Sequence, residues 1–440
     1  MEVLDELFIV ITEYLSYIRG QYMHRSFWMW VLFFFPFVVF LEIPRYLAPL
    51  IIYPLAKLFG FASDDLEKKK KFLQTNPEIS IVIAARNEEE VIGATLSSLV
   101  DIEYEHLEII LVDDHSTDST YEIGKRFEQR DDRVSVYRNR SAAGRGGRPF
   151  ASNYGFQMAT GEIIISVDAD TTFDRNMLLH AVGPFYDPEV GVVTGNLKAR
   201  NRGENYIVDL QACEYLMSIG FWKKWTDLFD VTLHASGAFS VFRRSVLEDV
   251  GGWDPELAED ADISVKAHKL GWNIRFAPRA IAMTTVPNTW SGLIGQRIRW
   301  DRGFLRTYYH KHGDVLRFWR FKLGTAFELV VEYLMQVVMT LVFPLYLVLM
   351  LVYLPLLLTF VILTTYFFYC AQTFLTLLFS IVSSERASSE WTLLQYTFLF
   401  PVYQMVMRWV RTYAIVLEMF RWQYRDTYLP DSVYDNTEKW

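Results

Sequence analysis

The apolar stretch from Phe321 to Val382 constrains the fold of this chain more than any other feature. It is hydrophobic over the length of about two membrane-spanning helices, with breaks expected near Pro344 and Pro355. Another apolar segment begins at about Trp391. We therefore expect the C-terminal part of the chain to cross a membrane, and three crossings are the simplest count.

A second apolar run lies near the N-terminus, from Trp28 to about Ile52. Its only charged residues are Glu42 and Arg45, and it lacks the small-residue cleavage site of a secretory signal. The whole sequence is 51% hydrophobic and 16% aromatic, which is more apolar than an ordinary soluble enzyme. The run is therefore predicted to be a retained transmembrane helix.

The charges around this run predict which side of the membrane the middle of the chain occupies. Lysines follow the run, at Lys57 and at Lys68–Lys71, and four acidic residues precede it: Glu2, Asp5, Glu6 and Glu13. Cytoplasmic flanks of membrane helices carry the excess of lysine and arginine, so the middle of the chain is expected in the cytoplasm. The arginines after residue 405 disagree with an external C-terminus, and Met405–Trp422 could instead lie along the membrane surface. The number of crossings stays open.

The polar middle of the chain alternates between two kinds of segment. Residues 79–85, 107–112 and 162–167 are short β-branched runs, whereas residues 89–99 have the apolar spacing of a helix. This alternation predicts an α/β domain with a mostly parallel sheet. The expected organisation is an extracytoplasmic segment (1–27), a transmembrane helix (28–56), a basic linker (57–76), the cytoplasmic domain (77–312), transmembrane or interfacial helices (313–425) and a polar tail (426–440).

All three β-branched runs end in polar residues that suit a ligand site. In a parallel sheet, ligands bind beyond the carboxyl ends of the strands. The residues at these ends are Ala85, Arg86, Asn87 and Glu88 for the first run, Asp113 and Asp114 for the second, and Asp168 and Asp170 for the third. The segment Asp113–Asp118 could also be a turn that caps a helix, since Asp, Ser and Thr accept backbone N–H bonds.

The pair Asp168 and Asp170 is the smallest set of protein ligands that can hold a divalent cation on a diphosphate. Hard cations prefer carboxylate oxygens and share their remaining positions with substrate phosphates and water. The alternative is an ordinary solvated turn. A glycine-rich cationic segment, Gly144–Arg148, either suits an oxyanion or is a loop with solvated arginines.

Two further segments lie between these acids and the C-terminal apolar stretch. Glu259-Asp260-Ala261-Asp262 opens a predicted helix that ends at Gly271, so its acids either supply a general base or only favour the helix dipole. Gln296-Arg297-Ile298-Arg299-Trp300 either supplies cations and a stacking surface or is an amphipathic helix at the membrane interface.

Other features exclude several classes of function. The net charge of −9, with no basic stripe, argues against nucleic acid as a partner. Cys213 and Cys370 lie far apart in sequence, so we expect neither a disulfide nor a zinc site. The eight histidines show no metal-ligand spacing.

Taken in order, these motifs resemble those of the processive family 2 glycosyltransferases, which include the cellulose, hyaluronan, chitin and poly-N-acetylglucosamine synthases. The resemblance covers residues 77–312. It implies a GT-A fold between transmembrane helices, an inverting mechanism, a UDP-sugar donor and Mg²⁺ or Mn²⁺. Three segments look most like the poly-N-acetylglucosamine synthases: Val192–Asn196, Ser236–Phe239 and Phe242–Arg244.

The resemblance also implies roles for individual residues. Arg148 stands where the family usually has lysine, which keeps the charge and changes the contact geometry. The other implied roles are contacts to uridine and its nucleoside (Ala85, Arg86, Asn87, Glu88, and Asp113 or Asp114), the metal and diphosphate pair (Asp168, Asp170), the general base (Asp260), the diphosphate grip (Gln296, Arg297, Arg299) and the acceptor site (Trp300, Glu259).

The expected function is therefore polymerisation of a β-linked polysaccharide, a hexosamine polymer by preference, from UDP-sugar at the cytoplasmic face of the cell membrane. The chain would pass outward through the protein's own spans. Expected partners are the donor, the growing polysaccharide, the lipid bilayer and small membrane or export subunits. Two alternatives stay open: transfer of one sugar to a membrane lipid, as in the ceramide glucosyltransferases, and a channel or scaffold subunit with an inactive transferase domain.

Overall fold

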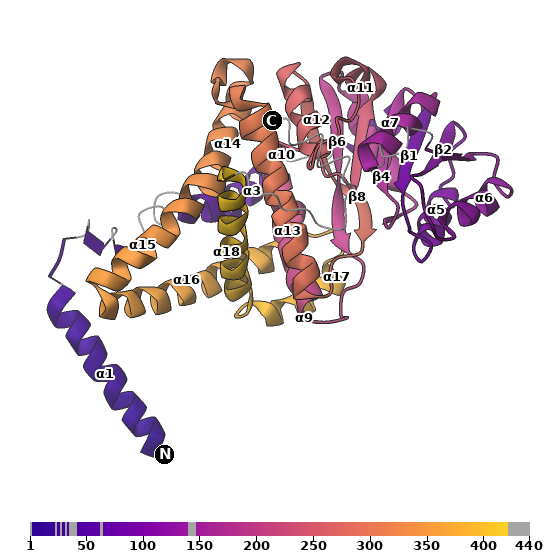
Figure 1. Cartoon of the computed structure of the whole chain (residues 1–440). Helices are drawn as coiled ribbons and strands as arrows, with labels where there is room; N and C mark the ends of the chain where they lie inside the picture. The colour runs from indigo at the N-terminus through magenta and orange to yellow at the C-terminus, as the bar shows by residue number, and fades with distance from the viewer. Residues whose placement is uncertain are drawn as a thin grey trace.

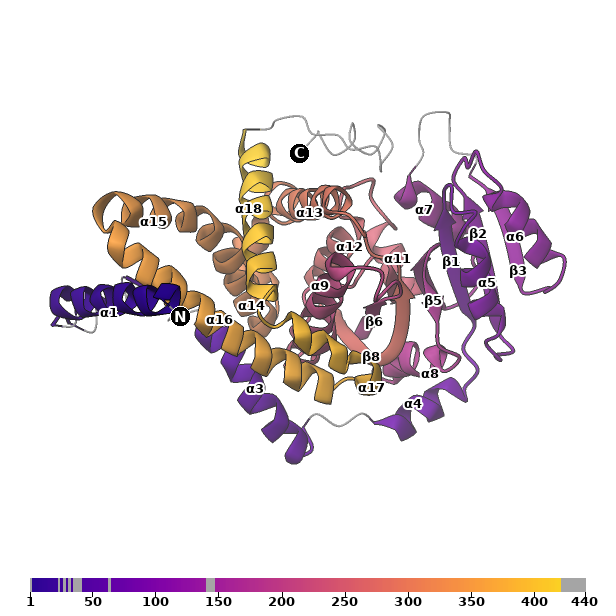
Figure 2. The same ribbon diagram turned by 90° about the horizontal axis from the view of Figure 1, so that it is seen from below.

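The computed structural model describes residues 2–22, 24–26, 29–30, 33–34, 42–61, 65–139 and 147–420. Within them, an α/β domain built around one sheet lies beside a group of long helices (Figures 1 and 2). Helix α1 (Glu2–Tyr22) extends away from the rest of the molecule at its N-terminal end (Figure 1).

The sheet has eight strands in the order β3-β2-β1-β4-β7-β6-β8-β5. Strands β3, β2, β1 and β4 run parallel, as do β6 and β8, whereas β7 and β5 are antiparallel to their neighbours. The predicted mostly parallel sheet is therefore confirmed. The strands are β1 (Ile79–Ala85), β2 (Leu107–Asp113), β3 (Val134–Arg138), β4 (Ile163–Asp168), β5 (Thr172–Phe173), β6 (Val190–Ala199), β7 (Phe239–Arg243) and β8 (Asn273–Thr284).

Helices cover both faces of the sheet, which is why its central strands are apolar on both sides. The helices of this domain are α5 (Ile92–Val100), α6 (Thr120–Glu128), α7 (Arg148–Met158), α8 (Met177–Ala181), α9 (Tyr206–Tyr215), α10 (Lys223–Leu228), α11 (Arg244–Val250) and α12 (Glu259–Lys269). A π-helical segment, η3 (Leu216–Trp222), joins α9 to α10.

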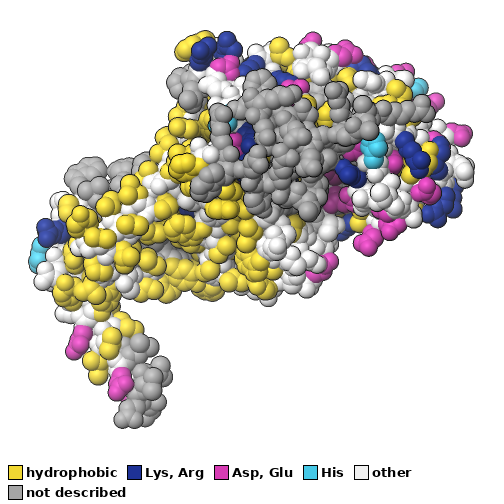
Figure 3. All heavy atoms as spheres, in the orientation of Figure 1, with side chains coloured by type: hydrophobic (Ala, Val, Ile, Leu, Met, Phe, Trp, Pro, Cys, Tyr) yellow, Lys and Arg dark blue, Asp and Glu magenta, His cyan; other side chains and the backbone are white. Residues whose placement is uncertain are grey.

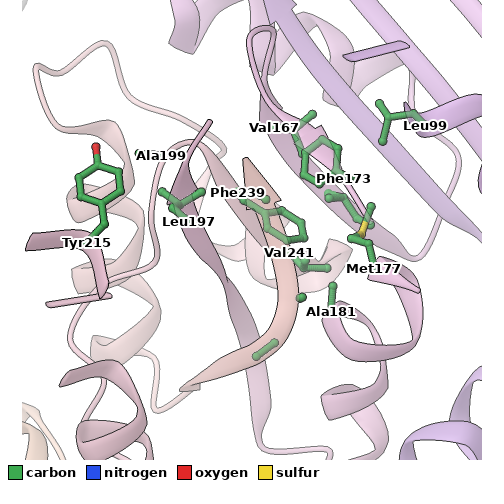
Figure 4. Close-up of a cluster of buried hydrophobic side chains, with 14 of the residues drawn as sticks. Leu99, Val167, Phe173, Met177, Ala181, Leu197, Ala199, Tyr215, Phe239 and Val241 are labelled. Atoms are coloured by element: carbon green, nitrogen blue, oxygen red, sulfur yellow. The ribbon is translucent and has the colours of Figure 1, made fainter. Parts of the chain in front are cut away.

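The core forms where these helices meet the strands. Helix α7 approaches β1 so closely that a Cβ atom at Gly155 would lie 2.4 Å from Cγ1 of Val82, so only glycine fits there. Figure 4 shows another part of the core, in which Phe239 of β7 lies near Phe173, with ring centroids 5.1 Å apart. Buried packing of this kind fixes the strands whose ends carry the candidate site.

The register of β1 with its two neighbours brings the predicted strand-end residues to one edge of the sheet. Ala84 pairs with Asp168 of β4, and Ala85 pairs with Asp113 of β2. The backbone N–H of Asp114 also donates to the carbonyl of Ala85 at 2.8 Å. All three groups of predicted residues therefore meet at the carboxyl ends of the parallel strands.

Two helices are long and apolar enough to cross a membrane among the residues that the structure describes. They are Leu323–Tyr353 and Pro355–Val382. The first is a continuous run of α14 (Leu323–Tyr333), the π-helical η7 (Leu334–Val338) and α15 (Met339–Tyr353), and the second is α16. The predicted break near Pro355 is confirmed. The break near Pro344 was wrong, because Pro344 lies inside α15 and the helix continues through it.

Apolar side chains gather over this helical part of the molecule, whereas charged side chains gather over the α/β domain (Figure 3). Helices α15 and α16 expose many large hydrophobic residues, including Leu345, Val348, Leu349, Leu351, Val352, Tyr353, Leu356, Ile362, Leu363 and Phe367. Contiguous apolar surface of this size is typical of a membrane or protein interface.

The third predicted C-terminal crossing does not take the expected form. After α16 the chain forms α17 (Ala387–Glu390), the 3-10 helix η8 (Trp391–Tyr396) and α18 (Phe400–Met419). Helix α18 carries Arg408, Arg411 and Glu418 and packs along α13 (Trp290–Leu305) through Val410, Ala414 and Leu417. The remaining predicted crossing, residues 28–56, falls partly outside the described residues, and α3 (Ile43–Leu58) occupies its second half.

Candidate active site

A cavity of about 1060 Å³ opens at the carboxyl ends of β1 and β4. It runs from these strand ends past α12 and α13 to the long helices α14, α16 and α18. All but one of the residues predicted for the site line this cavity: Ala85, Arg86, Asn87, Glu88, Asp114, Arg148, Asp168, Asp170, Glu259, Asp260, Gln296, Arg297, Arg299 and Trp300. Residues from distant parts of the sequence are thus brought to a single site.

Asp113 is the exception. Its position bears on the question, left open by the sequence, of whether Asp113 or Asp114 could contact a nucleoside. Its side chain is buried, and its carboxylate lies 4.0 Å from Nε of Arg138, away from the cavity lining. Asp114 lies in the cavity wall, where its carboxylate accepts hydrogen bonds from Nδ2 of Asn139 at 2.8 Å and from the backbone N–H of Gly147 at 2.5 Å. Of these two aspartates, Asp114 is therefore the one that a nucleoside in the cavity could meet.

The loops after β1 and β2 hold each other in place. Asn87, which has a left-handed backbone with φ of 56°, accepts a hydrogen bond from the N–H of Thr117 at 2.9 Å. The N–H of Glu88 donates to Oγ1 of Thr120 at 2.7 Å. The capping alternative also applies in part, since Asp118 accepts from the N–H of Thr120 at 3.0 Å at the start of α6. Within this turn, Asp118 stabilises the start of α6, whereas Asp114 lines the cavity.

Three carboxyl groups face a common part of the cavity at the strand ends. Burial and the charges of Asp170 and Asp168 raise the pKa of Glu88 to about 7. Burial and the charge of Asp168 likewise raise the pKa of Asp170, although Oγ1 of Thr284 donates to its carboxylate at 3.3 Å. Mutual repulsion of this kind favours a cation at the site.

The side chain of Arg148 crosses between the two groups of acids. Its Nε lies 2.8 Å from Oδ1 of Asp168, its Nη1 pairs with Glu259, and its Nη2 donates to the carbonyl of Gly237. Despite burial, the charges of Asp168 and Glu259 raise the pKa of Arg148 further above its ordinary range. Arg148 is therefore a fixed cation between the strand-end acids and α12. The glycine-rich residues 140–146 before it lie outside the described residues.

The three acids that open α12 have different environments. Asp260 accepts hydrogen bonds from the N–H of Gly237 and of Ala261, both at 2.8 Å, at the cavity wall. Glu259 pairs with Arg148, and burial raises its pKa. Asp262 is fully buried and has no access to the cavity. Of the three, Asp260 is placed best to meet a substrate hydroxyl.

The predicted Gln-x-x-Arg-Trp segment forms part of α13, where Gln296, Arg299 and Trp300 line the cavity. The indole of Trp300 is 42% exposed, so it can pack against a ligand. Arg297 is already paired, because its Nη2 donates to Glu214 at 2.8 Å and its guanidinium lies 4.4 Å from the Trp300 ring centre. It holds the indole in place from within the protein.

Several lining residues were missed by the reasoning from sequence. Lys223 and His234 lie in the cavity wall near Asp260, and Glu214 anchors Arg297. Ser236 lies in the same wall, and the sequence had singled out its segment only by resemblance. Lys223, His234 and Glu214 belong to no motif noted in the sequence, and they come together only because β6, β7 and the η3–α10 segment meet beside α12. A pair of lysines inside an otherwise apolar helical stretch, at Lys223 and Lys224, was the only available signal.

The carboxyl groups at the strand ends fit a divalent cation that a substrate would share. Among the described residues no group of three or more histidine, cysteine, aspartate or glutamate side chains is arranged to hold a metal. Asp168 and Asp170 offer two carboxylates, and Mg²⁺ or Mn²⁺ usually completes its shell with water and phosphate oxygens.

Comparison with known proteins identifies the α/β part of the chain. Residues 80–251 match the family described as Glycosyl transferase family 2. This segment is a family 2 glycosyltransferase domain. It contains β1 to β7, whereas α12 and α13 with Asp260 and Trp300 follow it in the sequence.

Curated proteins similar to this chain include polysaccharide synthases. The chain is 36% identical over 229 residues to the poly-beta-1,6-N-acetyl-D-glucosamine synthase of Staphylococcus epidermidis, covering 51% of this chain and 54% of that protein. It is 34% identical over 227 residues to the synthase of the same name from Staphylococcus aureus strain COL, with the same coverage. The chain thus spans about half the length of the curated relatives that it matches.

Among solved structures, the mannosyltransferase PcManGT from Pyrobaculum calidifontis, in complex with GDP-Man and Mn2+, is similar with a TM-score of 0.52. It is 20% identical in sequence, and the match covers 85% of this chain and 99% of that chain. At this identity the likeness shows a shared fold. The expected GT-A fold is confirmed.

Proposed function

We propose that this protein is an inverting, membrane-embedded glycosyltransferase that polymerises a β-linked hexosamine polysaccharide from a UDP-sugar. One observation carries the proposal: a single cavity joins the strand-end acids to Trp300 and continues between the long apolar helices. The relatives that match half of the chain are named as synthases of a β-linked N-acetylglucosamine polymer. A donor site, an acceptor site and an exit path therefore lie in one continuous space.

The donor would lie over the ends of β1, β2 and β4. Its nucleoside would meet Asn87 and Asp114, and its diphosphate would lie toward Asp168 and Asp170. A divalent cation, Mg²⁺ or Mn²⁺, would be held by these two aspartates and would neutralise charge on the leaving diphosphate when bound. Raised pKa values at Glu88 and Asp170 support this location, because burial and, after it, the charges of the neighbouring carboxylates disfavour uncompensated negative charge there.

Asp260 would act as the general base. The acceptor hydroxyl gives its proton to the Asp260 carboxylate as the oxygen attacks the anomeric carbon, and the bond from that carbon to the diphosphate breaks on the opposite face. UDP leaves, and the new linkage has inverted configuration. Gln296 and Arg299 lie in the same wall and would contact the departing diphosphate.

The acceptor would lie on Trp300, whose exposed indole suits the C–H face of a sugar. Beyond it the cavity wall includes the charged Glu328, Glu332 and Arg411 and several uncharged polar side chains of the long helices: Gln336, Gln372, Thr373, Thr376 and Gln404. Oε1 of Gln372 and Oγ1 of Thr376 are buried without a hydrogen-bond partner in the described part of the chain. Unpaired polar groups along this path support the passage of a hydroxyl-rich chain.

We also propose that the protein lies in the cell membrane with its catalytic domain in the cytoplasm, where UDP-sugars are made. The two apolar helices of the described residues and the apolar surface over them support this location. The growing polysaccharide is the acceptor, and small membrane or export subunits would be further partners.

A donor assay with a matched pair of variants tests the proposed site. Purified protein in detergent, given a panel of UDP-sugars with Mg²⁺ or Mn²⁺, should release UDP from one donor, UDP-N-acetylglucosamine by preference. Asp170→Asn should remove most of this turnover, because a lost metal contact costs several kcal/mol of transition-state stabilisation, on the order of a hundredfold or more in rate. Asp249→Asn removes an exposed acid of α11 outside the cavity and should leave the rate unchanged. Full activity in EDTA, or of the Asp170 variant, would contradict the metal assignment.

A further inference from the structure

The cavity wall beside Asp260 contains a lysine that the mechanism above does not use. Lys223 begins α10, directly after the π-helical segment η3, and is 7% exposed. Its Nζ donates to Oγ of Ser236 at 2.7 Å and to Oγ1 of Thr194 at 3.1 Å. Within the described residues it forms no ion pair with a carboxylate. Burying an ammonium group with only two hydroxyl groups as partners costs free energy, so we expect Lys223 to have a role at this position.

One of the two hydroxyl groups, that of Ser236, belongs to the turn that contacts Asp260, and the other, that of Thr194, belongs to strand β6. The N–H of Ser236 donates to the same Oγ1 of Thr194 at 3.0 Å, so Lys223, Thr194 and Ser236 form one closed group. The next residue, Gly237, donates its N–H to Oδ2 of Asp260 at 2.8 Å, and its carbonyl accepts from Arg148. Lys223 thus contacts the residue directly before the one whose backbone N–H donates to the proposed base.

The turn leaves little freedom for adjustment. A Cβ atom at Gly237 would lie 3.2 Å from Oδ2 of Asp260 and 3.3 Å from Nη1 of Arg148, so both side chains pack directly on the backbone there. Burial lowers the pKa of Lys223 to about 7, although the negative charge of Asp260 acts in the opposite direction. The two groups are therefore close enough to interact electrostatically without touching.

We infer that Lys223 is a positioning residue for the general base: through Ser236 and Gly237 it fixes the Asp260 carboxylate toward the acceptor hydroxyl. The inference rests on the proposed function, since it assigns Lys223 a role only if Asp260 takes the proton. A shift of about 1 Å in a catalytic group can lower a rate by a hundredfold. Lys223→Gln should therefore lower kcat by about tenfold to a hundredfold while leaving the affinity for UDP unchanged.

A double-mutant cycle with Asp260→Asn tests whether Lys223 acts through Asp260. If it does, Lys223→Gln should cause little further loss in the Asp260→Asn background, because the base that it positions is already absent. Lys224→Gln is the matched control. Lys224 is the next residue of α10 and is equally buried, but its Nζ contacts Glu385 and the Ser383 carbonyl away from Asp260. Lys224→Gln should change kcat by the same factor in the wild-type background and in the Asp260→Asn background.

A second variant keeps the test decisive if Lys223→Gln does not fold. Ser236→Ala removes one hydroxyl that Lys223 holds, and its loss of kcat should also disappear in the Asp260→Asn background. Equal losses with and without Asp260, or a parallel loss of UDP affinity measured by calorimetry, would overturn the role of Lys223. Near-normal turnover by Asp260→Asn alone would instead overturn the proposed base, so the two failures are distinguishable.

Discussion

At the scale of single residues, identical side chains in α12 have different roles because their surroundings differ. Asp262 accepts hydrogen bonds or ion pairs from His312 and Lys311 at 2.8 Å and from Lys266 at 3.0 Å. Despite burial, these contacts hold the pKa of Asp262 below its usual range, so they stabilise the fold at neutral pH and are lost only at strongly acidic pH. The sequence grouped Glu259, Asp260 and Asp262 because they are close in the chain. It could not separate them, because their distinguishing partners Arg148, Gly237 and His312 lie 111, 23 and 50 residues away, respectively.

The base assignment predicts that binding and turnover separate in the Asp260→Asn variant. The amide can still accept the Gly237 N–H but cannot take a proton, so transfer should fall by ~10²–10⁴-fold. UDP with metal should bind as in the wild type, because the donor contacts lie at the strand ends. UDP affinity by calorimetry and transfer by UDP release measure the two effects. A parallel collapse of both would make Asp260 a donor ligand.

The acceptor assignment predicts a different pattern for Trp300→Ala. An indole that supports the acceptor sugar should matter to the growing chain and hardly to the bound donor. The variant should therefore lose polymer formation and keep its UDP affinity, and any remaining activity should be hydrolysis of the UDP-sugar to free sugar. Trp319→Ala, an exposed indole outside the cavity, serves as the control. Normal polymer from the Trp300 variant would contradict this role.

At the scale of elements, the local sequence pattern was enough to predict β1, β2 and β4, because short β-branched runs between polar residues seldom form any structure other than a strand. It was not enough to predict the antiparallel insertion of β7 between β4 and β6, which depends on contacts between distant segments. The polar segment 383–390 is a similar case. In the sequence it is only a break after an apolar run, whereas in the structure it joins the apolar helices to the sheet.

This joining segment uses two buried ion pairs. Nζ of Lys198, at the end of β6, lies 2.5 Å from Glu390, and Nζ of Lys224 lies 2.8 Å from Glu385. Both lysines are buried, so each glutamate compensates a charge that water cannot reach. The segment therefore fixes the end of α16 relative to β6 and α10.

Glu390→Gln should lower stability strongly, because it leaves Lys198 buried and without its countercharge. Removing one partner of a buried pair costs about 3–5 kcal/mol. The melting temperature in detergent is the readout. Glu248→Gln is the control, since its pair with Arg244 spans 4.0 Å and the Glu248 side chain is 58% exposed. Equal melting temperatures for the two variants would show that the pair does not hold the segment.

At the scale of the whole molecule, the chain divides into a polar α/β half and an apolar helical half, and the cavity passes from one to the other. Composition and hydropathy predicted this division, since apolar runs of this length are rarely found in a soluble domain and indicate membrane helices. They could not predict that α18 packs on α13, because that contact joins Glu418 to Arg302 and Arg306 across more than a hundred residues of sequence. The count of crossings stays a prediction.

The product made by the purified protein tests the central claim most directly. The full chain in proteoliposomes would be given UDP-N-acetylglucosamine with Mg²⁺ and a limiting amount of acceptor, and the products would be separated by gel electrophoresis and by lipid extraction. A processive synthase should give long chains while most acceptors remain unextended, because the product stays in the path between the helices. If the only product at every donor concentration is a lipid carrying one added sugar, the polysaccharide function is contradicted and the glycolipid alternative takes its place.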